Sequence, residues 1–99
     1  MYIQGKVIAA FESQSGESTR GTWKKREFLL ETFAKVPKKV NLCLRGDMVD
    51  TIQINVGDLL KVSIDLESRE HNGRWFTEVR AWKVEPAEMH ASQDEEDRL

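Results

Sequence analysis

The sequence has one cysteine, two prolines and no apolar run that approaches the roughly 20 residues of a membrane-spanning helix. The single cysteine, Cys43, excludes an internal disulfide and fits a reducing compartment. The N-terminus lacks the basic patch and apolar stretch of a secretory signal peptide. We therefore expect a cytoplasmic protein that does not bind a membrane.

Residues for catalysis, metal binding and phosphate binding are also scarce. The two histidines, His71 and His90, have no evident partner, and Cys43 is best interpreted as a small strand residue. Structural zinc needs about four Cys or His ligands, and no Gly-rich loop leads into Gly-Lys-Ser/Thr. Asp47 and Asp50 suit a helix cap and a solvated face better than an acid pair. We expect no enzyme activity, no metal and no cofactor.

Charge is divided unevenly along the chain. The formal net charge is −2, but residues 85–99 carry six acids and one base, a net of −5, so residues 1–84 carry +3. A mildly basic body can meet a polyanion, whereas an acidic tail repels one. We predict a domain over residues 1–85 and a disordered acidic tail over residues 86–99, which has little apolar content.

The dominant sequence period is two, which is typical of β-strands. Residues 60–67 show it best, with an apolar face that runs from Leu60 to Leu66. Residues 39–45 alternate in the same way, and residues 13–22 are rich in turn formers and predict a long, mobile loop. His71-Asn72-Gly73 predicts a hairpin turn. The predicted strands are residues 2–11, 23–33, 39–45, 60–67 and 74–84.

A short helix is expected between the third and fourth strands. Gly46-Asp47 breaks the alternation, and Met48, Val49, Ile52 and Ile54 suit one or two helical turns that plug the end of a barrel. Five strands with this helix match the all-β, five-stranded oligonucleotide-binding (OB) barrel. A small five- or six-strand sandwich is the alternative.

Parts of the chain resemble known families. Val56 to Glu85 is similar to the last two barrel strands of bacterial single-stranded-DNA-binding (SSB) proteins. Arg74, Phe76, Glu78 and Val79 fall near the places of that family's Arg-(aromatic)-Thr-Glu-Val motif. Asp65 stands where that family often has Gly, and the tail ends in Arg98-Leu99 rather than Pro-Phe. Residues 1–85 resemble a family of small bacterial OB-like proteins of unknown function, through Gly5 to Ile8, Trp23 to Lys25, Leu30 to Thr32, Pro37 to Val40, Gly46-Asp47 and Asn72 to Trp75.

Aromatic and basic residues occur together in two clusters, at residues 23–28 and 74–83. This combination captures single strands by base stacking and phosphate contacts. In an OB barrel both clusters adjoin the usual groove, over the second and third strands. The resemblance to SSB implies DNA as the ligand. The predicted nucleic-acid-binding residues are Trp23, Lys24, Lys25, Arg26, Lys38, Lys39, Arg45, Arg74, Phe76, Arg80 and Trp82.

Each of these residues also has a structural interpretation. The aromatics could fill the core, and Lys24-Lys25-Arg26 could be a solvated edge. On the last strand we expect Trp75 and Val79 inside, with Phe76, Arg80 and Trp82 outside. Glu27, Glu31 and Glu78 interleave with the bases and predict weak, salt-dependent binding.

The rival function is a protein-interaction or assembly module without nucleic-acid binding. An aromatic strip around Phe76 and Trp82 would then form a dimer face, and a homo-oligomer is compatible with either function. The acidic tail could recruit a protein partner, or fold back on the basic groove and compete with nucleic acid.

Overall fold

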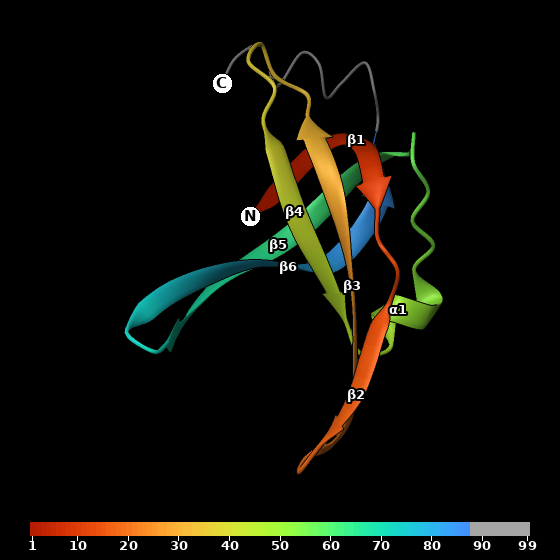
Figure 1. Cartoon of the computed structure of the whole chain (residues 1–99). Helices are drawn as coiled ribbons and strands as arrows, with labels where there is room; N and C mark the ends of the chain where they lie inside the picture. The colour runs from red at the N-terminus through yellow and green to blue at the C-terminus, as the bar shows by residue number, and fades with distance from the viewer. Residues whose placement is uncertain (88–99) are drawn as a thin grey trace.

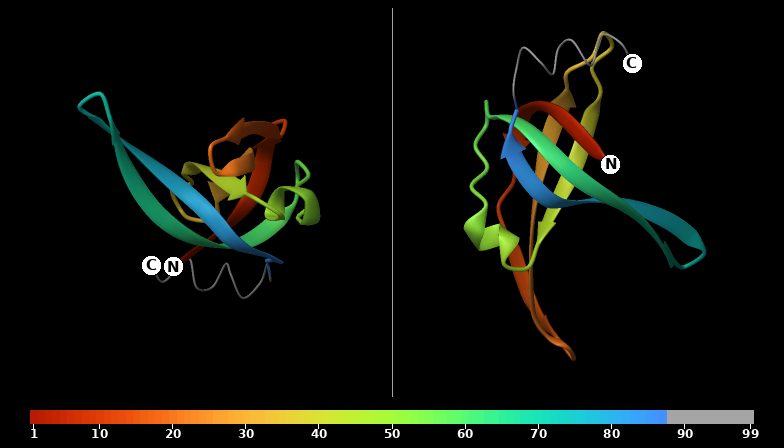
Figure 2. Two further views of the ribbon diagram at one scale, coloured as in Figure 1. Left: turned by 90° about the horizontal axis from the view of Figure 1, so that it is seen from below. Right: turned by 180° about the vertical axis from the view of Figure 1, so that it is seen from behind.

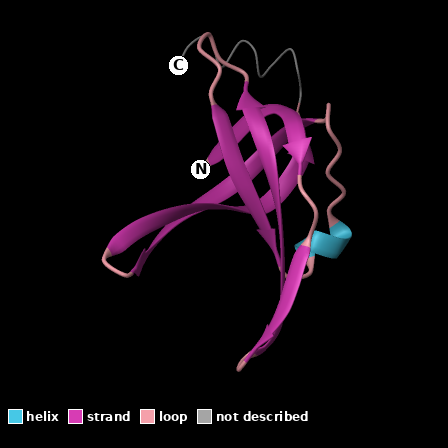
Figure 3. Cartoon of the chain, in the orientation of Figure 1, coloured by secondary structure: helices cyan, strands magenta, loops and turns pink. Residues whose placement is uncertain are grey.

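Six β-strands and one short helix make up residues 1–87, the part of the chain that the computed structural model describes (Figure 1, Figure 3). In chain order they are β1 (Tyr2–Ala10), β2 (Gln14–Ser18), β3 (Gly21–Thr32), β4 (Lys39–Arg45), α1 (Met48–Thr51), β5 (Leu59–His71) and β6 (Arg74–Pro86).

The strands form one sheet that closes on itself. Its order is β1-β5-β6-β4-β3-β2, and β1 also pairs with β3, so β1 lies hydrogen-bonded between β5 and β3. All pairings are antiparallel except a short parallel contact between β4 and β6 at Cys43 and Arg80. The predicted OB barrel is confirmed, with β1, β3, β4, β5 and β6 as its strands and α1 between the third and fourth.

Alternate residues of each barrel strand face inward and fill the barrel, as the period of two predicts. Its fully buried side chains are Val7, Phe28, Leu30, Leu42, Leu44 and Val62. Helix α1 and the residues after it cover one end, because Met48, Val49 and Ile52 pack on this core and Ile54 is buried within it. The predicted plug is therefore confirmed.

Two hairpins project from the barrel in different directions (Figure 1, Figure 2). One is the β2–β3 hairpin. The other is the outer part of β5 and β6, residues 66–79, which we call the β5–β6 arm. The arm turns at Asn72-Gly73, whose φ angles of 52° and 79° are those of a two-residue hairpin turn, so the predicted turn is confirmed. This turn sets His71 opposite Arg74, and every later pair along the arm follows from it.

The predicted mobile loop at residues 13–22 is wrong, because Gln14–Ser18 forms β2 and pairs with β3. The pattern gave no sign of it, since the strand is polar and five residues long. Two kinds of contact hold β2 against β3. The ladder runs from Gln14 opposite Lys25 to Ser18 opposite Gly21, and the Trp23 ring lies over Gly16.

Two predicted inward-facing residues lie outside. Trp75 is 69% exposed and Leu66 is 56% exposed, although both continue the inward-facing rows of their strands. The reason is that β5 and β6 extend beyond the barrel, where this face of the arm has no core to pack against. Val79, nearer the barrel, packs partly against the core. Phe76, Arg80 and Trp82 face outward, as predicted: Phe76 and Trp82 are exposed and Arg80 is partly exposed.

Strand β6 ends at Pro86, and the Ala87 N–H donates to the Leu59 carbonyl. Within residues 1–87, no helix is long and apolar enough to cross a membrane. The predictions for the tail fall largely on residues 88–99, which lie outside the described residues.

Candidate nucleic-acid interface

A cleft of about 470 Å³ lies between the outer face of β3 and β4 and the β5–β6 arm. Its size is in the range of small-molecule sites, which bind ligands of the size of a nucleoside. The lining residues are Lys25 and Glu27 from β3, Asn41, Cys43 and Arg45 from β4, Glu67 and Arg69 from β5, and Phe76, Thr77, Glu78 and Val79 from β6.

Strand parity brings the polar lining together. Phe28 and Leu42 pair across β3 and β4 and point into the core, so their neighbours in each strand point outward. Lys25 thereby lies opposite Arg45, and Glu27 lies opposite Cys43. The same alternation that builds the core thus places charged residues on the floor of the cleft.

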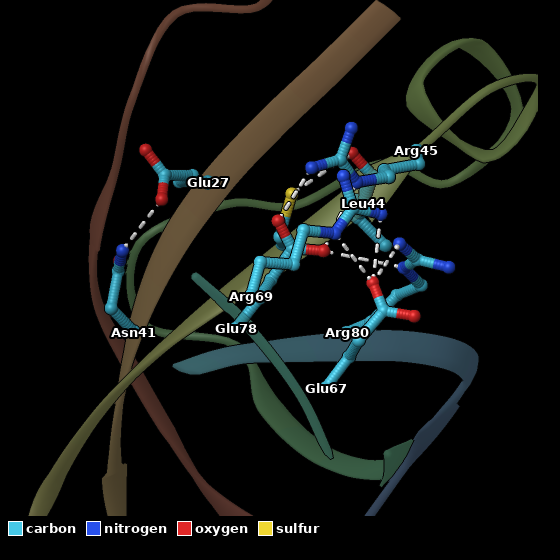
Figure 4. Close-up of polar contacts among 9 residues, drawn as sticks. Glu27, Asn41, Leu44, Arg45, Glu67, Arg69, Glu78 and Arg80 are labelled. Carbon is cyan, nitrogen blue, oxygen red and sulfur yellow. Dashed lines mark hydrogen bonds and ion pairs between the residues drawn. The ribbon is translucent and has the colours of Figure 1, made fainter. Parts of the chain in front are cut away.

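A chain of alternating charges links the arm to the barrel (Figure 4). Arg69 contacts Glu67 at 2.7 Å, and Glu67 lies 3.5 Å from Arg80. Arg80 contacts Glu78, whose two carboxylate oxygens accept hydrogen bonds of 3.1 and 2.5 Å from Arg45. Each of the three arginines contacts at least one of the two glutamates. These ion pairs fix the base of the arm and leave little positive charge free for a ligand.

Ion pairing shifts the pKa values of Glu78 and Arg45, the central pair of this chain of charges. Hydrogen bonds from Arg45 hold the pKa of Glu78 below its ordinary value of 4.5, and Glu78 in turn raises the pKa of Arg45. Both groups are therefore charged at neutral pH. Lys25 is the one cation of the cleft lining that forms no ion pair with another residue of 1–87.

The Arg45–Glu78 pair makes a testable contribution to acid stability. A carboxylate with a lowered pKa stabilises the folded state above its unfolded pKa, and this contribution is lost as the pH falls through the folded value. We expect Glu78→Gln to lower the free energy of unfolding by about 1 kcal/mol or less at neutral pH, because the pair is partly exposed. Urea titrations should show that the difference from wild type shrinks below about pH 4. A difference that stays constant down to that pH would contradict this origin.

Trp23 forms a flat aromatic surface on the β2–β3 hairpin. Its strand position is on the same outer face as Lys25, and its side chain is 40% exposed. A Cβ at Gly16 would lie 2.7 Å from the ring, so the indole lies against bare backbone across the ladder. The missing side chain at residue 16 therefore leaves room for the ring and fixes its plane.

The structure brings some predicted site residues together and separates others. Lys25, Arg45 and Phe76 line the cleft. Arg80 contacts it through Glu67 and Glu78, and Trp23 follows Lys25 along the same face of β3. The predicted residues outside the lining are Trp23, Lys24, Arg26, Lys38, Lys39, Arg74, Arg80 and Trp82.

Lys24 and Arg26 alternate with Lys25 and point to the opposite side of β3. Lys24 forms an ion pair of 2.5 Å with Asp50 of α1, which raises the pKa of the lysine. Arg26 donates to the carbonyls of Phe11 and Ile54, at 2.9 and 3.5 Å. Both cations therefore hold parts of the barrel together in this structure.

The remaining predicted residues lie at the borders of the barrel. Lys38 and Lys39 are exposed at the start of β4 and form no ion pair within residues 1–87. The Arg74 guanidinium lies 5.9 Å from the centre of the Phe76 ring, at the tip of the arm. Trp82 is exposed at the register shift in the β5–β6 ladder, between Ala81 and Lys83.

Sequence reasoning did not assign six polar residues of the lining to the site: Glu67 and Arg69 on β5, Thr77 and Glu78 on β6, and Glu27 and Asn41 on the floor. A signal for Arg69 was available. Counting back from the Asn72-Gly73 turn places Arg69 directly opposite Phe76. Glu27 was considered only as a charge that weakens binding, because the pairing of β3 with β4 cannot be read along one strand.

The thiol in the cleft lining is poorly placed to act as a nucleophile. Cys43 is buried, and burial together with Glu78 raises the pKa of its thiol, which disfavours the thiolate. Within residues 1–87, no cluster of three His, Cys, Asp or Glu side chains could hold a metal ion. The cleft offers an aromatic wall, hydrogen-bonding groups and Lys25, the one cation of its lining that is not paired with a residue of 1–87.

Comparisons with known proteins agree with this architecture. A family described as a domain of unknown function (DUF3127) matches residues 2–85. No curated protein sequence is significantly similar to the chain.

Several solved structures share the fold at low sequence identity. The SSB domain of a Synechococcus protein has a TM-score of 0.62 at 16% identity, over 85% of this chain and 90% of its own. A mitochondrial single-stranded DNA-binding protein of S. cerevisiae, Rim1, has a TM-score of 0.63 at 13% identity, over 87% and 91%. The second SSB of Mycobacterium smegmatis has a TM-score of 0.60 at 19% identity, over 88% and 84%.

Proposed function

The chain belongs to the DUF3127 family, and we propose that it binds single-stranded nucleic acid, DNA in particular, in the cleft beside the β5–β6 arm. The observation that carries the proposal is the convergence of Phe76, Lys25 and Arg45 on one cleft, with Trp23 continuing the same outer face. The structural relatives, which are SSB proteins, support it.

Stacking provides most of the expected affinity. Phe76 is 53% exposed and Trp23 is held flat over Gly16, so both rings can receive a base without rearrangement. Free cations are few, since Arg45, Arg69 and Arg80 are already paired with carboxylates. The affinity for a single strand should therefore be modest.

The test is fluorescence anisotropy of a labelled mixed-sequence oligonucleotide, at about 20 and about 200 mM salt, a range over which counterion release changes affinity. We expect saturable binding at low salt that weakens at high salt. A double-stranded oligonucleotide of the same sequence is the control, because its bases cannot stack on the rings. Absence of binding at both salt concentrations would refute the proposal.

Lys25 and Lys24 are adjacent lysines that offer a matched pair of variants. Lys25→Gln should weaken binding severalfold and reduce the slope of log affinity against log salt by about 0.7, the value for one phosphate contact on a single strand. Lys24→Gln should change neither, because Lys24 points to the other side of β3 and pairs with Asp50. The same anisotropy titration measures both variants, and equal losses would show that only bulk charge matters.

One observation favours the alternative of a protein-interaction module. Leu66 and Trp75 lie exposed on the arm face that is not covered by the barrel. A surface of this kind is typical of protein contacts, and such contacts depend little on salt. Association that persists at high salt and is lost in Trp75→Ala would support this alternative. A homo-oligomer, a partner for the tail and a cytoplasmic location stay predictions.

A further inference from the structure

The floor of the cleft carries a carboxylate, that of Glu27, which no cation of residues 1–87 neutralises. Asn41 Nδ2 donates a hydrogen bond of 2.9 Å to Glu27 Oε2, and Glu27 forms no ion pair with another residue of 1–87 (Figure 4). Glu67 and Glu78, the other carboxylates of the lining, are both paired with arginines. Glu27 therefore has a second oxygen available to a ligand in the cleft.

The hydrogen bond fixes the orientation of the Asn41 amide. Only the NH₂ end of an amide can face a carboxylate, so the second Nδ2 hydrogen remains available beside the free oxygen of Glu27. The pair therefore presents one acceptor next to one donor. A phosphate would be repelled by such a carboxylate, whereas an amine of a base would be accepted.

Resting on the proposed single-strand binding, we propose that Glu27 and Asn41 recognise a base edge with an exocyclic amine beside an unprotonated ring nitrogen, as in cytosine, and discriminate against uracil and thymine. The exocyclic amine at C4 of cytosine would donate to Glu27, and its ring nitrogen N3 would accept from Asn41. In uracil both groups are inverted, because a carbonyl replaces the amine and N3 carries a hydrogen. A uracil in the same place would leave the carboxylate facing an oxygen and the amide facing an N–H, and unpaired polar contacts of this kind lower affinity.

The test compares oligodeoxycytidine with oligodeoxyuridine of about 12 nucleotides, within the site sizes of OB folds, at neutral pH. These strands differ only in the edge of the base. The wild-type protein should bind the cytosine strand about fivefold more tightly or better, at the lower end of the discrimination that a paired side-chain contact provides. Glu27→Gln should reduce this ratio to near one, because a glutamine can present either a donor or an acceptor.

Glu31→Gln is the matched control. It removes the same charge two alternations along the same outward face of β3, outside the cleft lining. It should strengthen binding to both strands similarly and leave their ratio unchanged. Equal affinities of the wild-type protein for both strands would overturn the inference while the proposed function stands. Failure to bind either strand would overturn both.

Discussion

Phe76→Ala is expected to weaken binding of a mixed-sequence single strand by about 5- to 100-fold, the loss that follows when one base–aromatic stack is removed. The Phe76 ring is half exposed, lines the cleft and lies opposite Arg69 on the arm. Its substitution removes a stacking surface without opening a cavity, since no core side chain depends on it. Anisotropy titration at low salt measures the loss, and circular dichroism verifies that the fold is retained.

The adjacent Trp75 provides the control for this prediction. It is larger and more exposed than Phe76 but lies on the other face of the arm and does not line the cleft. Trp75→Ala should therefore leave affinity for the strand within about twofold, which corresponds to the small effects of surface substitutions. If Trp75→Ala costs as much as Phe76→Ala, the strand does not occupy this cleft. If only Trp75→Ala has an effect, the other face of the arm is the binding surface.

Gly5→Ala is expected to destabilise the barrel by about 3 kcal/mol, at the upper end of the cost of overpacking. A Cβ at residue 5 would lie 2.2 Å from the carbonyl oxygen of Glu31 and 3.0 Å from Cγ of Leu30. The backbone cannot move away easily, because Gly5 pairs with Thr32 on one side and with Leu60 on the other. For a domain whose total stability is about 5–15 kcal/mol, this loss is large.

Urea unfolding followed by far-ultraviolet circular dichroism measures this effect. Lys6→Ala, at the next residue of β1, is the control: its side chain is exposed, and its substitution should change stability by about 0.5 kcal/mol or less. An unfolding midpoint for Gly5→Ala equal to that of wild type would mean that β1 and β3 are not in such close contact in solution.

The sequence alone determined the elements of the barrel. The alternation at residues 39–45 predicted β4 with its observed bounds, and Asn72-Gly73 predicted the turn between β5 and β6. Local rules suffice here because the period of a strand and the φ angles of a turn depend on neighbouring residues only. The plug formed by α1 was predicted from local sequence as well, because apolar residues directly after the break at Gly46-Asp47 suit a helix that covers the end of a core.

The tertiary structure decided which side chains share a surface. The alternation of the strand predicted that Trp75 and Phe76 face opposite ways. It could not predict that β5 and β6 extend beyond the barrel, which leaves Trp75 without a core to pack against. β2 was missed because its stabilising contact, the Trp23 ring over Gly16, is made across the ladder and leaves no apolar period in the strand.

The tertiary structure also decided which of the basic residues of β3 are free to bind a ligand. The run Lys24-Lys25-Arg26 is uniform along the chain, yet Asp50 and the carbonyls of Phe11 and Ile54 bind its first and third members, and Lys25 alone enters the cleft. These partners come from other elements of the chain. The sequence thus determined the strands, the turn and the aromatic and basic residue types. The three-dimensional pairing of β3, β4 and the arm decided which charges are neutralised and which remain available to a ligand, because charge pairing depends on distance in space.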